Sequence, residues 1–546
     1  MSLSLPKIHD ISLSISKLIM KILFKSSVLC LSILLTACNS DDSQNSQKTP
    51  DTDNSSKFYQ TKTPYQPQQE IKTYEQIPEG YQAVFTELVA RHGSRGLSSI
   101  KYDLALYNLW KQAKAENALT PLGEQLGADI ETMMKANILL GYGIDGIRQF
   151  GYGNETIAGI KEHRGIADRL LQRLPTLFKT AAAQPASILV QSSGVDRAID
   201  SAKFFTNELI QQQPELKNQI TPLSYTSLAS SSIPTIEDSG VDRFKLYFHS
   251  LNQEQDLTQP LSVEQQAIYD ASQAYQQFEE DDADLANKLD ELAENTRAEQ
   301  VAMRVLTPIF KPEFIKKLGT SGYTFSNTGS YTVTAPSGET VTENGKGKNK
   351  IASAVDAAAY IYELYSISGG MQSELKGVSF DKYMPTDAAK FYAEFNDADD
   401  FYSKGPSFTE SNGVTSAMAQ GLKQDLFSQV DAVIERKQSH IAVLRFAHAE
   451  IIIPLATSLE LNNMMQPLPL RQTYSYDNSA WRGEMVSPMA ANLQWDIYQN
   501  AKGNTLVKMF YNEKETLFKP SCDYARTNSN SFYYDYLKLK QCYQMQ

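Results

Sequence analysis

Arg91-His92-Gly93-Ser94-Arg95 is a stretch whose residue types suit phosphoryl chemistry. It follows an apolar run, residues 83–89, which predicts a buried strand, and the glycine predicts a turn at the strand's carboxyl end, where open α/β sheets bind ligands. Two guanidinium groups match phosphate oxygens, and as like charges they keep the imidazole between them neutral and therefore nucleophilic. The alternative for so short a motif is a buried histidine beside two solvated arginines.

A second chemical group follows another predicted strand, residues 441–447, and consists of His448-Ala449-Glu450. If the two strands are parallel, His448 lies beside His92 and can donate to phosphoryl oxygens, and Glu450 can protonate the leaving oxygen. Zinc deaminases also contain H-x-E, but they need a P-C-x-x-C segment that this chain lacks. H-E-x-x-H and G-x-x-x-x-G-K-[ST] are also absent, so we expect neither a metal nor another cofactor.

Two further cations could contribute to an anion site. Arg197 begins a predicted helix that follows the strand at residues 188–191 and a short polar turn, and a helix start of this kind binds anions. Lys101 follows the first motif closely enough to reach a substrate, although a solvated lysine on a helix is the simpler interpretation.

The first motif resembles the R-H-G-x-R signature of the histidine phosphatase superfamily, in its acid phosphatase and phytase branch. The H-A-E form at His448 resembles the multiple inositol polyphosphate phosphatases, whereas other members of the branch carry H-D. The resemblance implies a phosphohistidine on His92, phosphate binding by Arg91, Arg95, Arg197 and His448, and acid catalysis by Glu450. Tyr402-Ser403-Lys404-Gly405 is similar to a lysine-glycine segment of the same phosphatases, which makes Lys404 a candidate substrate contact.

Strand and helix patterns predict an α/β fold, a three-layer α/β/α core around a mainly parallel sheet. The core is expected at residues 76–205 and 436–546, with a helical excursion at about 99–174. Residues 206–435 are mostly helical, with a small hairpin around Pro336-Ser337-Gly338, and resemble the cap domain that this family inserts into its core.

The N-terminal 38 residues have the pattern of a bacterial export signal. A basic start at Met20, the more natural initiator, precedes an apolar run too short to span a membrane, and Leu35-Thr36-Ala37-Cys38 resembles a lipobox. We therefore expect a lipoprotein anchored through Cys38, and Asn39 after it resembles lipoproteins of the outer membrane, on either its periplasmic or its cell-surface face. Residues 39–75 are polar and are expected to form a flexible tether.

Only Cys522 and Cys542 remain in the expected folded part, and in an oxidising compartment a disulfide between them is expected. The formal net charge of −12 argues against nucleic acid as a ligand, but it permits a small polyanion at a locally basic site.

These observations predict a phosphomonoester hydrolase that acts on inositol polyphosphates such as phytate. A broad acid phosphatase that acts on sugar phosphates is the nearest alternative, because a hexakisphosphate needs several basic groups beyond the phosphate pocket. A surface lipoprotein that binds phosphorylated ligands without turnover is a further alternative, although both histidines and the acid are present.

Overall fold

The computed structural model describes residues 57–183, 187–220, 240–293, 296–438, 440–461 and 463–545. The predicted signal peptide, Cys38 and the first part of the tether lie outside these ranges. None of the helices in the described ranges is both long and apolar enough to cross a bilayer.

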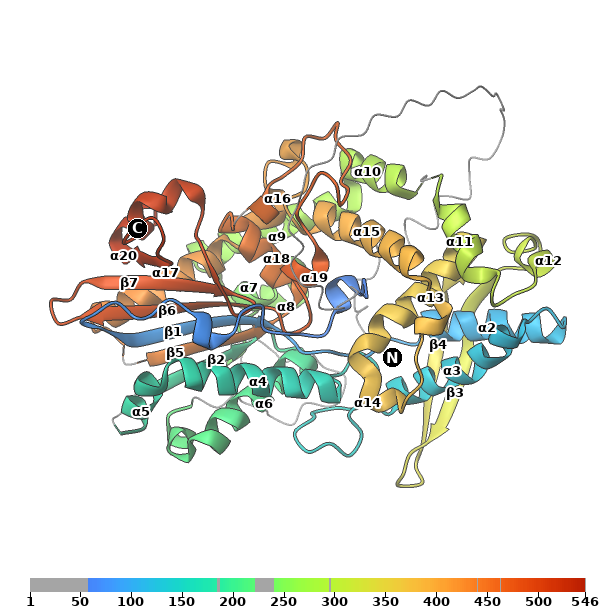
Figure 1. Ribbon diagram of the computed structural model, residues 1–546, viewed down its shortest axis with the longest axis horizontal. Coiled ribbons are helices and arrows are strands. Elements are labelled where there is room, and N and C mark those ends of the chain that lie inside the picture. Colours follow the sequence, from blue (N-terminus) through green and yellow to red (C-terminus); the bar gives the residue numbers. More distant parts are fainter. Residues whose placement is uncertain are drawn as a thin grey trace, which may run out of the picture.

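A seven-stranded sheet forms the centre of the described structure, in the order β2-β5-β1-β6-β7-β8 with β9 also paired to β7 (Figure 1). Its strands are β1 (Tyr81–Arg91), β2 (Ser187–Ser192), β5 (His440–Ala447), β6 (Asn492–Asn500), β7 (Thr505–Tyr511), β8 (Lys514–Thr516) and β9 (Tyr533–Asp535). The three strands predicted before the chemical motifs are all present, as β1, β2 and β5, and β5 pairs in parallel with both of the others.

The sheet is mixed, which corrects the prediction of a mainly parallel one. β1 pairs antiparallel with β6, and β6, β7, β8 and β9 continue the antiparallel half. The connection from β6 to β7 spans only residues 501–504, and a parallel crossover needs roughly a dozen residues or more. A short connection of this length therefore makes an antiparallel pair.

Helices cover both faces of the sheet, so the predicted three-layer α/β/α core is present. On one face α4 (Ile157–Arg173), α5 (Pro175–Ala183) and α6 (Asp196–Gln212) bury the side of β1 that carries Leu88 and Ala90. On the other face α17 (Gln420–Ile434), α18 (Ala449–Ser458) and α20 (Tyr536–Cys542) pack on Phe85 and Val89. Burial on both sides explains the nearly continuous apolar sequence of β1.

A second hydrophobic core holds together a helical region, drawn at the right of Figure 1. It contains α2 (Tyr102–Ala115), α3 (Pro121–Ile138), α11 (Ala298–Leu306), α13 (Ala354–Ser368), part of α15 (Thr386–Ser403) and the hairpin of β3 (Phe325–Thr334) and β4 (Thr340–Ile351). The predicted hairpin is therefore present. The expected division at residues 206–435 is too simple, because α2 and α3 join this region and α17 packs on the sheet instead.

The segment that includes residues 57–75 is part of the folded structure and not of a tether. Tyr65 and Tyr74 are buried, and both of their hydroxyls donate to Glu513, the first to the side chain and the second to the backbone carbonyl. The polar composition that predicted a tether misses these two aromatic anchors. Residues 57–75 therefore do not belong to the expected flexible region.

Cys522 and Cys542 form the expected disulfide, with a Cα–Cα distance of 5.7 Å. It joins positions 20 residues apart and fixes α20 against the C-terminal 3₁₀ helix Pro520–Ala525. Replacing both cysteines with serine should lower the free energy of unfolding by about 3 kcal/mol, because the unfolded chain regains the entropy of an open loop. Denaturant unfolding of the two proteins measures the change, and equal midpoints under oxidising conditions would contradict it; under reducing conditions the midpoints should converge.

Candidate active site

The carboxyl ends of β1, β5 and β2 bring three distant segments to one edge of the sheet. Arg91 at the end of β1 pairs with Ala447 at the end of β5, so His92 and His448 both leave the sheet there. Their ring centroids lie 5.5 Å apart. Arg197 enters from the first turn of α6, and its Nη2 lies 3.4 Å from Nδ1 of His448.

His92 is held as a neutral imidazole with one defined tautomer. Its Nδ1 lies 2.9 Å from the carbonyl oxygen of Gly93, which can only accept, so Nδ1 carries the proton. Nε2, which has no hydrogen bond within the described residues, therefore keeps its lone pair. Burial lowers the pKa of His92 well below its ordinary value, and the charges of Arg197 and Arg91 lower it further. The ring is consequently an uncharged nucleophile.

The loop after His92 is fixed by two buried carboxylates. Glu155 accepts from the amide of Gly93 at 3.0 Å, and Glu162 accepts from the amide and the hydroxyl of Ser94, each at 2.7 Å. A Cβ at Gly93 would lie 2.6 Å from the Glu155 carboxylate and 2.6 Å from Cα of Gly159. Only glycine fits this close approach, which explains why the motif contains it.

Three guanidinium groups lie near His92 and have N–H donors without a hydrogen-bond partner in the described structure. The Nε atoms of Arg91, Arg95 and Arg197 are buried and have no hydrogen-bond partner in the described structure. Burial lowers the pKa of Arg91 to about 10 and that of Arg95 to about 9, and the positive charge of Arg197 contributes to both shifts. Unpaired cations this close together are costly unless an anion joins them, so the site fits a tetrahedral oxyanion.

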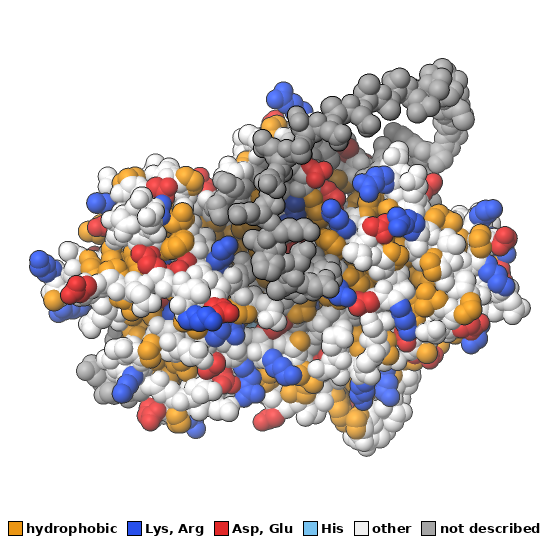
Figure 2. Space-filling view, viewed as in Figure 1, with side chains coloured by type: hydrophobic (Ala, Val, Ile, Leu, Met, Phe, Trp, Pro, Cys, Tyr) orange, Lys and Arg blue, Asp and Glu red, His pale blue; other side chains and the backbone are white. Residues whose placement is uncertain are grey.

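Arg91 is buried, and Arg95 and Arg197 are half-buried. Figure 2 shows Lys and Arg side chains scattered among Asp and Glu side chains on the face it draws, without one large basic patch. Arg91 is only 4% exposed, and its Nη1 donates to backbone carbonyls of Thr61, Ser487 and Pro488. A chain with a net charge of −12 therefore still offers a strongly positive pocket.

His448 has the opposite tautomer to His92. Its Nδ1 faces Nη2 of Arg197, which can only donate, so Nε2 carries the proton and donates to Oγ of Ser193 at 2.8 Å. Burial, and then the charge of Arg197, lowers the pKa of His448 well below its ordinary value. The ring is thus neutral, and its one N–H is donated to Ser193.

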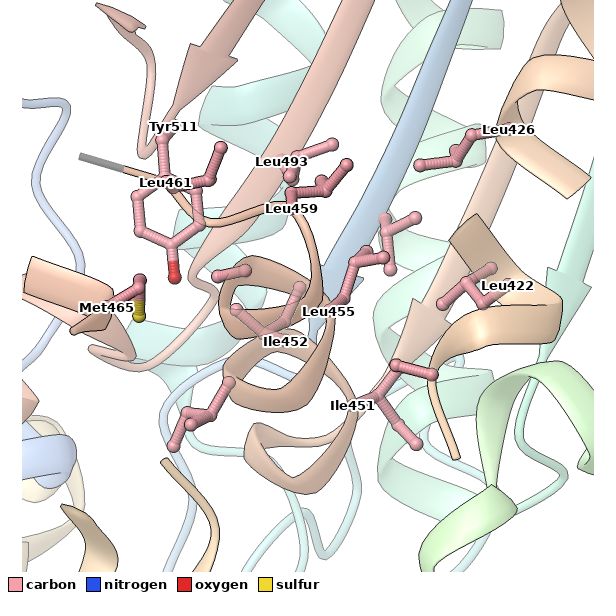
Figure 3. Close-up of a cluster of buried hydrophobic side chains, with 14 of the residues drawn as sticks. Leu422, Leu426, Ile451, Ile452, Leu455, Leu459, Leu461, Met465, Leu493 and Tyr511 are labelled. Atoms are coloured by element: carbon pink, nitrogen blue, oxygen red, sulfur yellow. The ribbon is translucent and has the colours of Figure 1, made fainter. Parts of the chain in front are cut away.

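Glu450 lies two residues after His448, in the first turn of α18. His448 is the N-cap residue of this helix. Figure 3 shows the apolar side chains that anchor α18 between α17 and the sheet: Leu422, Leu426, Ile451, Ile452, Leu455, Leu459, Leu461, Met465, Leu493 and Tyr511. Such dense packing leaves the carboxylate little freedom to move away from the pocket.

A proton donor is expected to be protonated before the reaction, but Glu450 is ionised in the structure without a ligand. Burial alone would raise the pKa of this carboxyl, but the positive charge of Lys404 outweighs burial, so the pKa is lowered. Nζ of Lys404 lies 3.8 Å from Oε1 of Glu450. In the pocket without a ligand, Glu450 is therefore a carboxylate.

The two candidate lysines have different positions. Lys404, just after α15, belongs to the site through Glu450 and through Asp400, whose Oδ1 is 2.6 Å from its Nζ. Lys101 is buried at the start of α2, next to Ile100, whose carbonyl accepts from Asn327 of the β3–β4 hairpin.

The sequence interpretation gave no role to Tyr247 and only a structural role to His249, but both lie beside His448. Their ring centroids lie 5.7 and 6.3 Å from that of His448, and both nitrogens of the buried His249 lack a hydrogen-bond partner in the described structure. Burial, and after it mainly the charge of Arg243, lowers the pKa of His249 to about 4 against the opposing effect of Glu450. Neither residue stands in a recognisable motif, and only the 3₁₀ turn Phe248–Ser250 packed against α18 brings them here.

The fold and the paired histidines define a histidine phosphatase, and the comparison with family models agrees. Residues 82–512 match the model of the histidine phosphatase superfamily, branch 2. The chain belongs to this family, as its two motifs predicted, and it is a histidine-type phosphatase.

Individual relatives indicate which members of the family this chain resembles. Human multiple inositol polyphosphate phosphatase 1 is 29% identical over 138 residues, a match that spans 23% of this chain and 28% of the human protein. The structure of Bifidobacterium longum multiple inositol polyphosphate phosphatase with inositol hexasulfate is 31% identical, with a TM-score of 0.75, and the match covers 89% of this chain and 97% of that one. The phytase from D. castellii shares the fold alone, at 12% identity and a TM-score of 0.56, over 89% of this chain and 84% of that one.

Proposed function

We propose that this protein hydrolyses phosphate monoesters of inositol through a phosphohistidine on His92. One observation carries the proposal. Nε2 of the neutral His92 has a free lone pair, and it lies among three guanidinium groups whose Nε atoms have no hydrogen-bond partner in the described structure. A nucleophile and a ready-made oxyanion site are thus combined in one buried pocket.

The reaction proceeds in two displacements at phosphorus. Nε2 of His92 forms a bond to phosphorus while the bond to the ester oxygen breaks, and Glu450 gives its proton to that oxygen. Water then attacks phosphorus, the P–N bond breaks, and Glu450 accepts the proton of the water. Arg91, Arg95 and Arg197 offset the charge on the non-bridging oxygens in both steps, and His448 joins them by turning its Nε2–H from Ser193 to a phosphoryl oxygen.

Inositol polyphosphates such as phytate are the proposed substrates. The B. longum structure that this chain matches over most of its length was solved with inositol hexasulfate, a polyanion of the same shape. Lys404 at the edge of the pocket adds a cation beyond those that surround the transferred phosphate. Phosphate release from phytate should therefore exceed release from a simple sugar phosphate, and equal rates would favour the broad acid phosphatase.

Trapping the covalent intermediate tests the chemistry itself. Rapid quenching of the turnover mixture should yield a phosphoryl group on His92 that is stable in base and lost in acid. Turnover that leaves no such adduct on His92 under any quench would overturn the proposed mechanism.

We also propose that the enzyme is exported and held at the outer membrane by a lipid on Cys38. The supports are the signal pattern of the sequence and the lipobox-like Leu35-Thr36-Ala37-Cys38. An alkyne-tagged fatty acid supplied to cells should label the wild type but not a Cys38→Ala variant, and equal labelling would contradict the anchor.

A further inference from the structure

Lys404 holds a central place beside the proton donor. Its Nζ lies 2.6 Å from Oδ1 of Asp400, one helical turn back, and 3.8 Å from Oε1 of Glu450. Asp400 also accepts from Nε2 of Gln60, which fixes it from the opposite side. The ammonium group is therefore shared between two carboxylates, one of which belongs to the chemistry.

Lys404 is a group next to Glu450 that keeps its positive charge. Burial disfavours its charged form, but Asp400 and Glu450 more than compensate, and its pKa is raised. The nearby imidazoles of His249 and His448 have lowered pKa values and stay neutral under mild conditions. Removal of Lys404 thus leaves a buried carboxyl whose pKa burial raises.

Other groups around Glu450 do not replace Lys404. Glu450 interacts with Arg91, Arg95 and Arg197 across the pocket, but the phosphate of a bound ester would neutralise these three. From α9 (Val263–Asp281), Tyr275 and Glu279 also interact with it. Burial raises the pKa of Tyr275 and keeps its hydroxyl neutral, and Glu279, when it is ionised, favours the protonated form of Glu450.

We propose that Lys404 is a positioning residue that makes Glu450 change protonation state with the occupancy of the pocket. This inference rests on the proposed function. In the empty pocket Lys404 keeps Glu450 ionised. A bound polyphosphate brings several negative charges that compete for the ammonium group, so Glu450 takes up a proton, which it then gives to the leaving oxygen. Once the leaving group has gone, Lys404 again pairs with the carboxylate, which receives the proton of the attacking water.

Proton uptake on ligand binding tests this directly. Inositol hexasulfate, which cannot be dephosphorylated, is titrated into the enzyme by calorimetry in buffers of different ionisation enthalpy at mildly acidic pH. The wild type should take up about one proton. Lys404→Gln should take up clearly less than the wild type, because loss of the ammonium group leaves Glu450 protonated in part before the ligand binds, and Glu450→Gln should take up none because the site of uptake is gone.

The matched control is Lys288→Gln. Lys288 is also a largely buried lysine paired with a carboxylate, Glu291 at 2.7 Å, but it lies outside the pocket, so the variant should behave as the wild type does. No uptake by the wild type, or full uptake by Lys404→Gln, would overturn the proposal. Uptake that persists in Glu450→Gln would assign the proton to another group, either an imidazole or Glu279, whose pKa burial raises to about 7, and would overturn the proposal as well.

Kinetics give a second, independent readout. Lys404→Gln should accumulate phosphohistidine during turnover, with dephosphorylation slowed about tenfold, because a protonated Glu450 cannot serve as a base. Lys404→Arg should restore most of the rate. A rise in KM alone would make Lys404 a plain substrate contact and refute the positioning role. Failure of the wild type to hydrolyse any phosphate ester would instead refute the proposed function.

Discussion

Replacing His92 with alanine is expected to lower kcat by about 10⁴-fold or more and to abolish the trapped phosphoenzyme. Nε2 of His92 is the atom that bonds to phosphorus, and the neighbouring His448 cannot replace it, because its Nε2 carries a proton that is donated to Ser193. Rapid-quench labelling and steady-state phosphate release together measure the effect.

The same variant separates an enzyme from a binding protein. The three arginines remain in His92→Ala, so inositol hexasulfate should bind with an affinity close to that of the wild type. If the wild type bound this ligand but released no phosphate from any ester, the chain would be a binder without turnover. Residual turnover in the variant above roughly one part in a thousand would require a different nucleophile.

Replacing Glu450 with glutamine should slow hydrolysis in proportion to how badly the leaving group needs a proton. An inositol alkoxide is a poor leaving group, so kcat for phytate should fall by about 10²- to 10³-fold. A nitrophenolate leaves without protonation, so phosphohistidine formation from p-nitrophenyl phosphate should change little. The amide keeps the size of the side chain but removes its proton chemistry and the negative charge that pairs with Lys404.

Burst kinetics with p-nitrophenyl phosphate complete the test of Glu450. The Glu450→Gln variant should release a rapid burst of nitrophenolate, equal to the amount of enzyme, and then continue slowly, because the second step has lost its base. An equal loss on both substrates in the first step would show that Glu450 positions the substrate and does not transfer a proton.

The positions of the two histidines could be predicted because each follows a strand with a clear apolar signature. Residues 83–89 and 441–447 are buried on both faces of the sheet, so their sequences are nearly continuous apolar runs. The parallel pairing of β1 with β5 then brings His92 and His448 to the same edge. Arg197 could be found in the same way, from a strand, a turn and a helix start.

The charge state of Glu450 could not be predicted from its neighbours in the sequence. It depends on Lys404, which lies 46 positions earlier and approaches only when α15 packs near the pocket. For a similar reason the sequence suggests only a structural role for His249, because a short 3₁₀ turn against α18 leaves no periodic pattern. The antiparallel half of the sheet was missed because β6 (Asn492–Asn500) contains buried polar residues such as Gln494 and Asp496 that disguise a strand.

The segment between the proposed membrane anchor and β1 touches the chemistry at two points. The backbone carbonyl of Thr61 accepts from Arg91, and the neighbouring Gln60 donates to Asp400, the partner of Lys404. A chain shortened to begin at β1 would therefore lose the Thr61 carbonyl that accepts from Arg91. It would also lose the Gln60 amide that donates to Asp400, the partner of Lys404. A shortened form for laboratory work should begin upstream of Lys57, so that Gln60 and Thr61 keep their contacts with the active site.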